Sequence, residues 1–441
     1  MTPAPSPVVE PWRGEWAALW RRAAAGAHSR TVGYATQAIF REGWVRRLLI
    51  VAVALVAALG VASAVALTAA AQGTGPLAAP AAPQVSYQPA ERSAGGASTG
   101  TAPASSANPA EPVSVRAAGG TLDGVTLTGP DGETVDGALS PDRSTWTSTA
   151  PLDYATTYTW HGRALGADGA TTPVAGTLGT LKPAHEVRGT LNIGDGRTVG
   201  VAAPIEIRFD RHVDDRAAVE RALKVTTSTP VEGSWGWLPD DNGGSRVHWR
   251  PKEYWPAGTH VRVDAPLFGV GYGGANYGAE NLSTSFDIGR AQVVKADTRS
   301  FRMVVERDGS QVASYPASYG LAADPDRNTR SGTHVVTEKF TDKRMVSPQY
   351  GYDLVEKWAV RMSNNGEFIH ANPASASAQG ASNVTHGCVN LSPADAKAYY
   401  DSARYGDPVE VTGTPVRLSP KDGDISDWTL SWDRWQQLSA L

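Results

Sequence analysis

The pattern of apolar and polar positions divides the 441-residue chain into regions of different character. Residues 48–71 form one apolar run without a charged side chain, and residues 72–111 are mostly Ala, Pro, Gly and Ser. After about residue 112, short runs carry apolar residues at every second position and end at Gly, Pro, Asn or Asp. Such runs are typical of β-strands. We therefore predict a mainly β chain behind an N-terminal apolar helix.

The apolar run at 48–71 is long enough to span a membrane, since a spanning helix needs roughly 20 residues. Residues 1–47 contain seven arginines and three glutamates, and such an excess of arginine marks the cytoplasmic side. We expect a single-pass anchor in the cell membrane, with residues 1–47 cytoplasmic and the remainder extracellular. The alternative is a signal peptide cleaved near Ala69-Ala70-Ala71, although the lead-in and the apolar run are both longer than such peptides have.

The segment at 72–111 contains a single aromatic residue among its small and proline side chains. A segment of this composition buries too little apolar surface to offset the entropy of ordering. We predict that it is a disordered stalk.

An internal repeat organises the region after the stalk. Trp146 and Trp249 each precede a proline-containing turn and then an alternating strand. Two copies of one pattern, about 100 residues apart, indicate two β-sandwich modules. We predict immunoglobulin-like modules at 112–182 and 183–290, the second with a helix at 214–223.

The residue pattern changes again in the region 291–413, which we predict to be a third domain. Strands are predicted on both sides of Asp308-Gly309, a strong hairpin signal. A further strand begins at Gly332, and a loop with Met345, Tyr350 and Tyr352 follows it. Two more strands are expected around 357–363 and 366–371.

A helix is predicted over 394–402, because Ser392 suits the N-cap position and Pro393 suits the first helical position. The last segment, 414–441, contains Trp428, Trp432 and Trp435. An exposed sugar-binding stripe is one interpretation of these tryptophans. Clustered large aromatics are more often buried, so we expect this tail to pack on the second module.

Composition narrows the class of function. The net charge is −4, and the predicted extracellular part has no dense cluster of Lys and Arg, which argues against a nucleic-acid partner. The nine histidines are scattered and no two are spaced as metal ligands on one helix face. The sequence therefore predicts neither a metal nor another cofactor.

Cys388 is the only cysteine of the chain, so it cannot form an internal disulfide. The first interpretation of a lone cysteine is a small buried hydrophobic residue. However, Cys388 lies directly before the predicted helix, where backbone N–H groups and a nearby protonated histidine favour a low thiol pKa. His386 is close in sequence, but residues two apart on a strand lie about 7 Å apart. His370, on another strand, can face the sulfur directly.

These residues carry a resemblance. His370, fourteen intervening residues and then Thr385-His386-Gly387-Cys388-Val389-Asn390 match the motif of the L,D-transpeptidase catalytic domain. The order of anchor, stalk, two Ig-like modules, catalytic domain and Trp-bearing tail also resembles the membrane-anchored L,D-transpeptidases of actinobacterial cell walls. The resemblance covers about 112–441.

The resemblance implies an activity and roles for residues. Family members cut peptidoglycan tetrapeptide stems after the third residue, hold the acyl group as a thioester and transfer it to the amine of another stem, which makes a 3→3 cross-link. Cys388 would be the nucleophile and His370 the general base, with the carbonyl of Ala371 orienting the imidazole. The N–H groups of Gly387 and Cys388 would form the oxyanion hole.

The resemblance also assigns residues around the nucleophile. His386 would be a supporting residue, Asn390 a substrate contact, and Met345 and Tyr350 parts of a lid over the donor pocket. Two departures put the shape of that pocket in doubt. The segment after Tyr350 is short, so a second lid tyrosine is either missing or supplied by Tyr352. Ala374 stands where a tryptophan is often found, and Trp358 is expected to belong to the core.

The expected partners are stem peptides, the membrane and, as inhibitors, β-lactams of the carbapenem class. Two other functions stay open. An L,D-carboxypeptidase would pass the same acyl group to water, and a non-catalytic scaffold would use the Ig-like modules to bind the wall. The intact pair of His370 and Cys388 argues against the scaffold.

Overall fold

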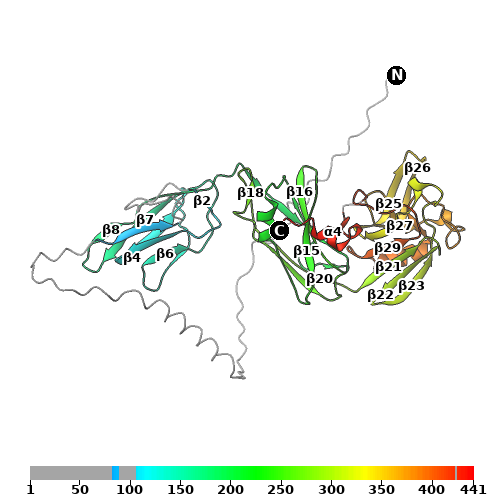
Figure 1. The fold of residues 1–441 in the computed structure, drawn as a ribbon, viewed down its shortest axis with the longest axis horizontal. Helices are drawn as coiled ribbons and strands as arrows, with labels where there is room; N and C mark the ends of the chain where they lie inside the picture. The colour runs from blue at the N-terminus through cyan, green and yellow to red at the C-terminus, as the bar shows by residue number, and fades with distance from the viewer. Residues whose placement is uncertain (1–81, 89–105, 423–424) are drawn as a thin grey trace, which may run out of the picture. The chain divides into compact units, whose positions relative to one another are not determined.

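The computed structural model of the chain describes residues 82–88, 106–422 and 425–441. The predicted cytoplasmic segment 1–47 and the predicted membrane helix 48–71 lie outside these residues. Within the described ranges, no helix is both long and apolar enough to cross a bilayer. The described strands form seven sheets, which confirms the prediction of a mainly β chain (Figure 1).

The first module is built from two facing sheets whose inner side chains form one apolar core, including Trp146 and Trp160. One sheet has the order β1-β3-β6-β5 and the other the order β2-β9-β7-β4, with β8 beside β7. The strands are β1 (Gln84–Gln88), β2 (Ser106–Ala107), β3 (Ser114–Ala118), β4 (Gly120–Thr128), β5 (Gly137–Leu139), β6 (Thr145–Ser148), β7 (Thr157–Gly166), β8 (Thr171–Pro173) and β9 (Gly176–Thr180).

The stalk predicted at 72–111 is wrong in two places. Residues 84–88 form β1, an antiparallel neighbour of β3, and residues 106–107 form β2, which pairs with β9. Val85 is buried in the core of the module. Composition hid these strands because β1 is five residues long, and its stability comes from pairing with β3 and from burial of Val85.

The second module contains two four-stranded sheets, β11-β13-β16-β15 and β12-β20-β17-β14, and a small sheet, β10-β19-β18. The strands are β10 (His185–Val187), β11 (Gly189–Leu191), β12 (Thr198–Val199), β13 (Ile205–Phe209), β14 (Lys224–Thr227), β15 (Gly233–Asp241), β16 (Gly244–Pro251), β17 (His260–Ala265), β18 (Gly271–Gly273), β19 (Asn276–Gly278) and β20 (Leu282–Ile288). The predicted helix is confirmed as α2 (Arg216–Ala222), which Asp215 caps.

The internal tryptophan repeat has a physical basis in both modules. Trp146 on β6 and Trp249 on β16 each precede the next long strand, β7 and β17. In each module the indole lies over a glycine of the adjacent strand, Gly137 or Gly233, where an added Cβ would come within 2.0 Å or 1.9 Å of the ring. The repeat is therefore a tryptophan together with the glycine that makes room for it.

The third domain contains a five-stranded sheet, β23-β22-β21-β29-β24, and a four-stranded sheet, β25-β26-β27-β28 (Figure 1, yellow-green to orange). The strands are β21 (Gln292–Asp297), β22 (Arg302–Arg307), β23 (Ser310–Pro316), β24 (Gly332–Val335), β25 (Glu338–Ser347), β26 (Tyr352–Arg361), β27 (Phe368–Ala371), β28 (Val389–Leu391) and β29 (Pro408–Thr412). Its helix is α3 (Pro393–Ser402) and its 3-10 turns are η2 (Pro325–Arg327) and η3 (Pro373–Ser375), and the C-terminal segment adds η4 (Asp427–Thr429) and α4 (Trp432–Gln436).

Both local signals in this domain are confirmed. Asp308 and Gly309 have φ values of 50° and 77°, the left-handed turn that joins β22 to β23. Ser392 caps α3 by accepting a hydrogen bond from the backbone N–H of Asp395 at 3.1 Å. Helix α3 packs on β26 and β27, and Tyr399 is fully buried in the core between the layers.

The predicted loop with Met345, Tyr350 and Tyr352 is instead a long hairpin, so that prediction is wrong. Met345 lies within β25, Tyr352 begins β26, and only the turn between the two strands, which includes Tyr350, is irregular. Ser347 pairs with Tyr352 at the closing end. The many polar residues of β25 hid its strand character, because cross-strand pairing rather than an apolar face holds the hairpin.

The C-terminal segment packs on the second module. Trp435 is fully buried and donates a hydrogen bond to the carbonyl of Ser234 at 3.0 Å, and Trp428 donates to the carbonyl of Ala202 at 2.9 Å. The Arg250 guanidinium lies 4.7 Å from the ring centre of Trp428 and 5.3 Å from that of Trp432. These contacts link residues more than 175 positions apart, so they join the end of the chain to the second module.

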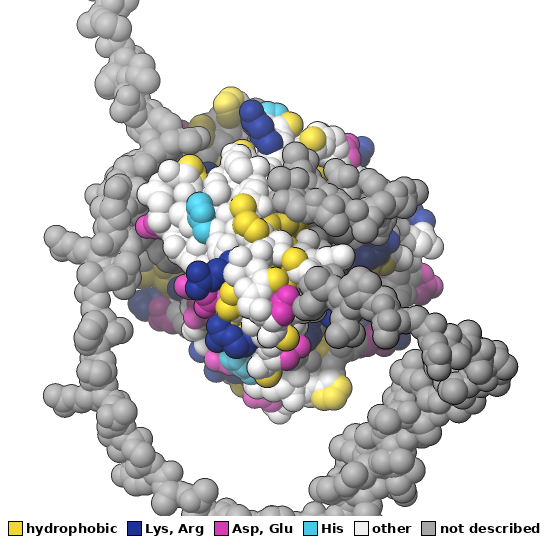
Figure 2. Space-filling view, turned by 90° about the vertical axis from the view of Figure 1, so that its left-hand side faces the viewer, with side chains coloured by type: hydrophobic (Ala, Val, Ile, Leu, Met, Phe, Trp, Pro, Cys, Tyr) yellow, Lys and Arg dark blue, Asp and Glu magenta, His cyan; other side chains and the backbone are white. Residues whose placement is uncertain are grey.

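Charged side chains of both signs are mixed on the face shown in Figure 2. Lys and Arg side chains lie next to Asp and Glu side chains there, with uncharged residues between them. A face of this kind does not present the continuous basic surface that binds nucleic acid.

Candidate active site

The backbone around Cys388 is held in an irregular bend just before β28. Gly387 has φ +113°, a conformation that side chains other than glycine rarely adopt. Thr329 donates a hydrogen bond from its hydroxyl to the carbonyl of Gly387 at 2.8 Å, and Thr385 donates one to the carbonyl of Cys388 at 2.7 Å. The thiol of Cys388 is free and half-buried. The bend therefore presents one accessible sulfur on a fixed backbone.

His370 lies on β27, which runs parallel to β28, and it is the register partner of Asn390. The side chain is buried, and Nδ1 donates a hydrogen bond to the carbonyl of Ala371 at 2.9 Å. The structure thus brings His370 from an adjacent strand to the segment that carries Cys388. It also places the Ala371 carbonyl at the imidazole, as the resemblance implied.

The charge state of His370 depends on its neighbours. Burial by itself would lower the pKa of His370, but the interactions with Cys388 and with Glu356, together with the Ala371 carbonyl, raise the pKa to about 10. The Sγ of Cys388 also lies 3.6 Å from the carbonyl of Gly366. Since a thiolate has no proton to donate, the Gly366 contact belongs to the thiol, and the pairing with the imidazolium belongs to the thiolate.

A cavity of about 370 Å³ opens over this pair. Its volume falls within the range usual for small-molecule sites. The lining residues are Met345, Tyr350, Tyr352, Leu354, Glu356, His370, Asn372, Ala374, Ser375, Val384, Thr385, His386, Cys388 and Asn390.

Most side chains predicted for the site meet in this cavity. Met345, Tyr350, His386 and Asn390 all line it together with Cys388 and His370. Tyr352 lines it as well, which favours the alternative in which Tyr352 supplies the second tyrosine of the lid. The Oδ1 atom of Asn390 is buried without a hydrogen-bond partner in the described part of the chain.

His386 and Trp358 lie in different surroundings. His386 is exposed, and its ring centre lies 4.3 Å from that of Tyr350 and 5.5 Å from that of Tyr352. Partial burial, and then the positive charge of Arg327, lower the pKa of His386, so it is neutral at neutral pH. Trp358 packs against Tyr400 at a ring distance of 5.4 Å and belongs to the core rather than to the cavity.

Sequence reasoning missed several residues of the site, above all Glu356. It also missed Leu354, Asn372 and Ser375. One signal was present in the sequence: Tyr352, Leu354 and Glu356 alternate, and alternate residues of a strand share a face. That signal was lost because the first half of β26 was interpreted as a loop.

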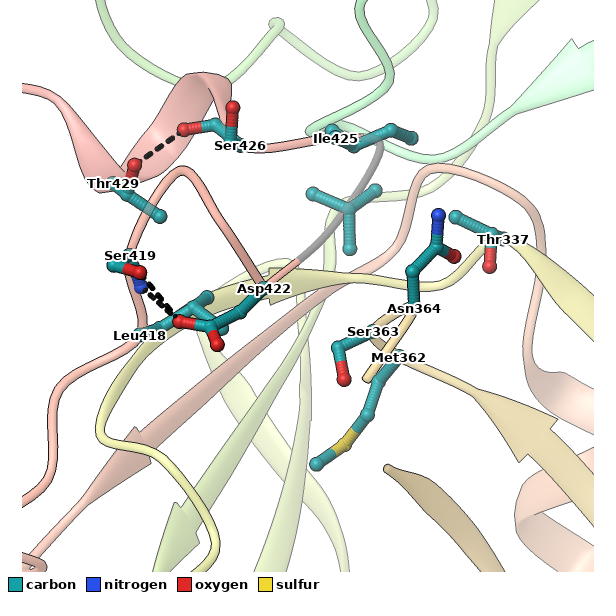
Figure 3. A pocket seen from close by; sticks show the side chains of 11 residues that line it. Thr337, Met362, Ser363, Asn364, Leu418, Ser419, Asp422, Ile425, Ser426 and Thr429 are labelled. Carbon is teal, nitrogen blue, oxygen red and sulfur yellow. Dashed lines mark hydrogen bonds between the residues drawn. The ribbon is translucent and has the colours of Figure 1, made fainter. Parts of the chain in front are cut away.

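A second cavity, shown in Figure 3, lies between the end of β26 and the C-terminal segment. Asp422 accepts hydrogen bonds there from the backbone N–H and the hydroxyl of Ser419, both at 2.7 Å. The cavity has a volume of about 10 Å³, close to that of a single water site. A stem peptide cannot enter a space of this size.

No residues of a metal site come together in the described part of the chain. Among residues 82–88, 106–422 and 425–441, no group of three or more His, Cys, Asp or Glu side chains is placed to hold a metal ion.

Comparison with known protein families places two regions of the chain. Residues 104–271 match the bacterial Ig domain, and residues 291–411 match the L,D-transpeptidase catalytic domain. The second match contains every residue of the thiol and imidazole site. The domains therefore define an enzyme of the L,D-transpeptidase type that carries Ig-like modules.

Similarity to whole proteins agrees with these matches. L,D-transpeptidase 5 of Mycobacterium tuberculosis (strain ATCC 25618 / H37Rv) is 52% identical over 82% of this chain and 78% of its own length. L,D-transpeptidase 2 of the same species (strain CDC 1551 / Oshkosh) is 38% identical over 75% and 81%. The chain belongs to the L,D-transpeptidase family.

Solved structures of similar proteins include an L,D-transpeptidase, LdtMt1, in complex with imipenem. That chain is 32% identical and covers 52% of this chain and 100% of its own length, with a TM-score of 0.44.

Proposed function

We propose that this protein is a peptidoglycan L,D-transpeptidase of cell-wall biogenesis that forms 3→3 cross-links between stem peptides through a thioester on Cys388. One observation carries the proposal. The only cysteine of the chain lines a cavity together with a buried histidine, whose Nδ1 is fixed by the Ala371 carbonyl. Family membership supplies the reaction class, and the roles of individual residues are the proposal.

The first half-reaction would form the acyl-enzyme. A protonated imidazole beside a thiol favours the thiolate, which is the nucleophilic form of cysteine. The sulfur attacks the carbonyl carbon between the third and fourth residues of the donor stem, and the C–N bond breaks. His370 gives its proton to the departing amine of the fourth residue. The acyl group then remains on Cys388 as a thioester.

The second half-reaction would transfer the acyl group. The side-chain amine of another stem attacks the thioester carbon, its proton passes to His370, and the sulfur leaves as the thiolate. The backbone N–H groups of Gly387 and Cys388 are our candidates for the oxyanion hole, where one donor is worth about 3 kcal/mol. The bend fixed by Thr329 and Thr385 holds these groups in place.

The walls of the cavity would bind the donor stem. Met345, Tyr350 and Tyr352 supply apolar and aromatic surface from the hairpin, and the His386 ring lies tilted beside the tyrosines. The unpartnered Oδ1 of Asn390 is available to an N–H group of the substrate. We propose the same cavity as the site at which carbapenems acylate Cys388.

The experiment is mass spectrometry of the full-length protein and its Cys388→Ser variant after incubation with a disaccharide-tetrapeptide. The proposed function predicts a 3→3 dimer with the wild type and none with the variant. A free tripeptide in place of the dimer would indicate an L,D-carboxypeptidase, and no product would indicate a scaffold. A carbapenem should add one drug mass to the Cys388 peptide, and an unchanged mass would contradict the assignment of the nucleophile.

We also propose that residues 48–71 anchor the protein in the cell membrane, with the catalytic domain outside. The apolar run and the arginines before it support this proposal. Full-length chain should be found in the membrane fraction. A soluble mature protein that begins near Gln72 would contradict it.

A further inference from the structure

Among the described residues that line the cavity, Glu356 is the one that carries a carboxylate. It lies on β26, on the same face as Tyr352 and Leu354, and lines the cavity with them. Its Oε2 atom is 3.7 Å from Nδ1 of His370, and the two side chains are 13% and 4% exposed. At this distance and burial, the negative charge acts on the imidazole with little screening by water.

The other acidic residues of the same hairpin have different partners. Glu338 pairs with Arg361, Asp342 with Lys357 and Asp353 with Arg344, all on the two strands of the hairpin. Glu356, in contrast, has its ionic contact with His370, while Lys343, its register partner on β25, places its Nζ 4.3 Å from the ring centre of Phe340. The residues lining the cavity include no Lys or Arg that would neutralise Glu356 from the open side.

The groups around the imidazole change during the proposed reaction. In the free enzyme, Cys388 faces the ring from the bend before β28 and the Glu356 carboxylate faces it from β26, while Asn390 of β28 is uncharged. Once the acyl group is on sulfur, Cys388 is a neutral thioester and its attraction for the imidazolium is gone. Glu356 then remains as the negative charge beside His370.

The second half-reaction makes the larger demand on His370 as a base. The acceptor amine forms a C–N bond with the thioester carbon while the C–S bond breaks, and the amine proton must reach the ring nitrogen opposite Nδ1. Alkyl ammonium groups of this type have pKa values near 10, so a weakly basic imidazole takes such a proton poorly. A carboxylate at Nδ1 makes the imidazole a stronger base.

We propose that Glu356 is a positioning residue for the second half-reaction: its carboxylate keeps His370 oriented and basic enough to accept the proton of the incoming amine. This inference rests on the proposed transpeptidase function. Trp358, two residues further along β26, has φ +55°, a conformation that is rare for a tryptophan. This local irregularity follows directly after the segment whose alternate side chains face the cavity. The direction of the His370 pKa agrees with the proposed influence of Glu356.

The test separates the two half-reactions in the full-length protein. Wild type, Glu356→Gln and Glu356→Asp are compared, with Glu338→Gln as the matched control, because Glu338 lies on the same hairpin and pairs with Arg361. Carbapenem acylation, followed by mass, reports the first half-reaction. Dimer formation from disaccharide-tetrapeptide, measured over pH 5–10, reports both.

At pH values above the acid limb of the profile, Glu356→Gln should lower dimer formation by up to about tenfold, which corresponds to one pKa unit of His370 basicity. The acid limb of its pH profile should move to lower pH, because the imidazolium of the acyl-enzyme loses its proton more easily without the carboxylate. Carbapenem acylation should change less, since the thiolate still faces His370 in that step. Glu356→Asp should restore part of the transfer rate, and Glu338→Gln should behave as the wild type.

Three outcomes would overturn the inference. An unchanged rate and pH profile of dimer formation in Glu356→Gln would show that the carboxylate does not act on His370. Equal losses of acylation and transfer in both Glu356 variants would assign Glu356 a purely structural role. If the wild type forms no dimer, the proposed function fails, and the inference fails with it. If the wild type forms dimer and Glu356→Gln is unaffected, only the inference about Glu356 is contradicted, and the proposed function stands.

Discussion

His370 and His248 are both buried beside carboxylates, and they differ in the other groups that surround the imidazole ring. The ring of His248, on β16, has Nδ1 3.1 Å from both carboxylate oxygens of Asp427, and its Nε2 is 3.4 Å from Glu206. The Nε2 distance brings charge attraction without a well-formed hydrogen bond. Burial alone would lower the pKa of His248, but Asp427 and then Glu206 raise it to about 9.

The comparison separates a structural ion pair from a pair that we propose to be reactive. His248 and Asp427 are both completely shielded from solvent, and they join the second module to the C-terminal segment. His370 has a similarly raised pKa, but its neighbour is a thiol on the wall of an open cavity. A raised histidine pKa therefore marks a functional site only where a nucleophile and space for a substrate lie beside it.

The largest expected effect is on catalysis. His370→Ala should lower carbapenem acylation by 10²–10⁴-fold, or about 3–5 kcal/mol of barrier, because the proton acceptor and positive partner of the thiol are lost. The remaining rate should rise with pH toward the ordinary thiol pKa of about 8.5. Stopped-flow acylation over pH 5–10 measures both changes. A variant that keeps its reactivity at low pH would place the base elsewhere.

The equivalent change at the structural pair should affect stability instead. Asp427→Asn removes the main partner of a buried charge, so the free energy of unfolding should fall by about 3–5 kcal/mol. Calorimetry measures the loss, and Asp433→Asn, an exposed position in α4, is the matched control. Carbapenem acylation below the unfolding temperature should stay within about twofold of the wild type. A large loss of acylation with unchanged stability would make the His248 pair part of the catalytic machinery.

The two histidines should also be visible in the pH dependence of stability. A folded pKa of about 9 for His248, against about 6.5 unfolded, means that its contribution is complete below pH 6.5 and is lost as pH rises to 9. The contribution of His370 should be lost over a window that extends to about pH 10. The melting temperature should therefore fall between pH 6.5 and 10. Asp427→Asn should flatten the lower part of this fall, and an unchanged slope would contradict the His248 assignment.

The smallest expected effect is at His386. Because His386 is exposed and neutral beside Tyr350 and Tyr352, His386→Ala should lower acylation by less than about tenfold and leave the shape of the pH profile intact. The same stopped-flow series serves as the measurement. If His386→Ala loses the low-pH reactivity while His370→Ala keeps it, the roles of the two histidines are reversed.

Local signals in the sequence were sufficient where the structure depends on neighbouring residues. The hairpin turn at Asp308-Gly309 follows from left-handed backbone conformations that these residues tolerate. The start of α3 follows from the Ser392 cap. The motif from His370 to Cys388 predicted the strand of His370 and the candidate nucleophile, since all of it lies within nineteen residues.

Prediction from the sequence failed for strands that form only because they pair with another strand. Strand β1 exists because β3 offers it a partner, and the hairpin of β25 and β26 exists because its polar residues pair across the strands. Neither has the sustained apolar alternation that predicts a strand alone. For this reason the stalk was extended too far, and Met345 and Tyr352 were assigned to a loop.

By itself, the sequence determined the mainly β class, the family motif and the position of its single thiol, because composition, turn residues and motif spacing are properties of short segments. Only the tertiary structure decided which charges meet. It set Glu356 of β26 against His370 of β27, and it joined His248 to Asp427 across 179 positions of sequence. Such pairs are fixed by strand register and by the packing of distant segments, and neither is encoded in the spacing of residues along the chain.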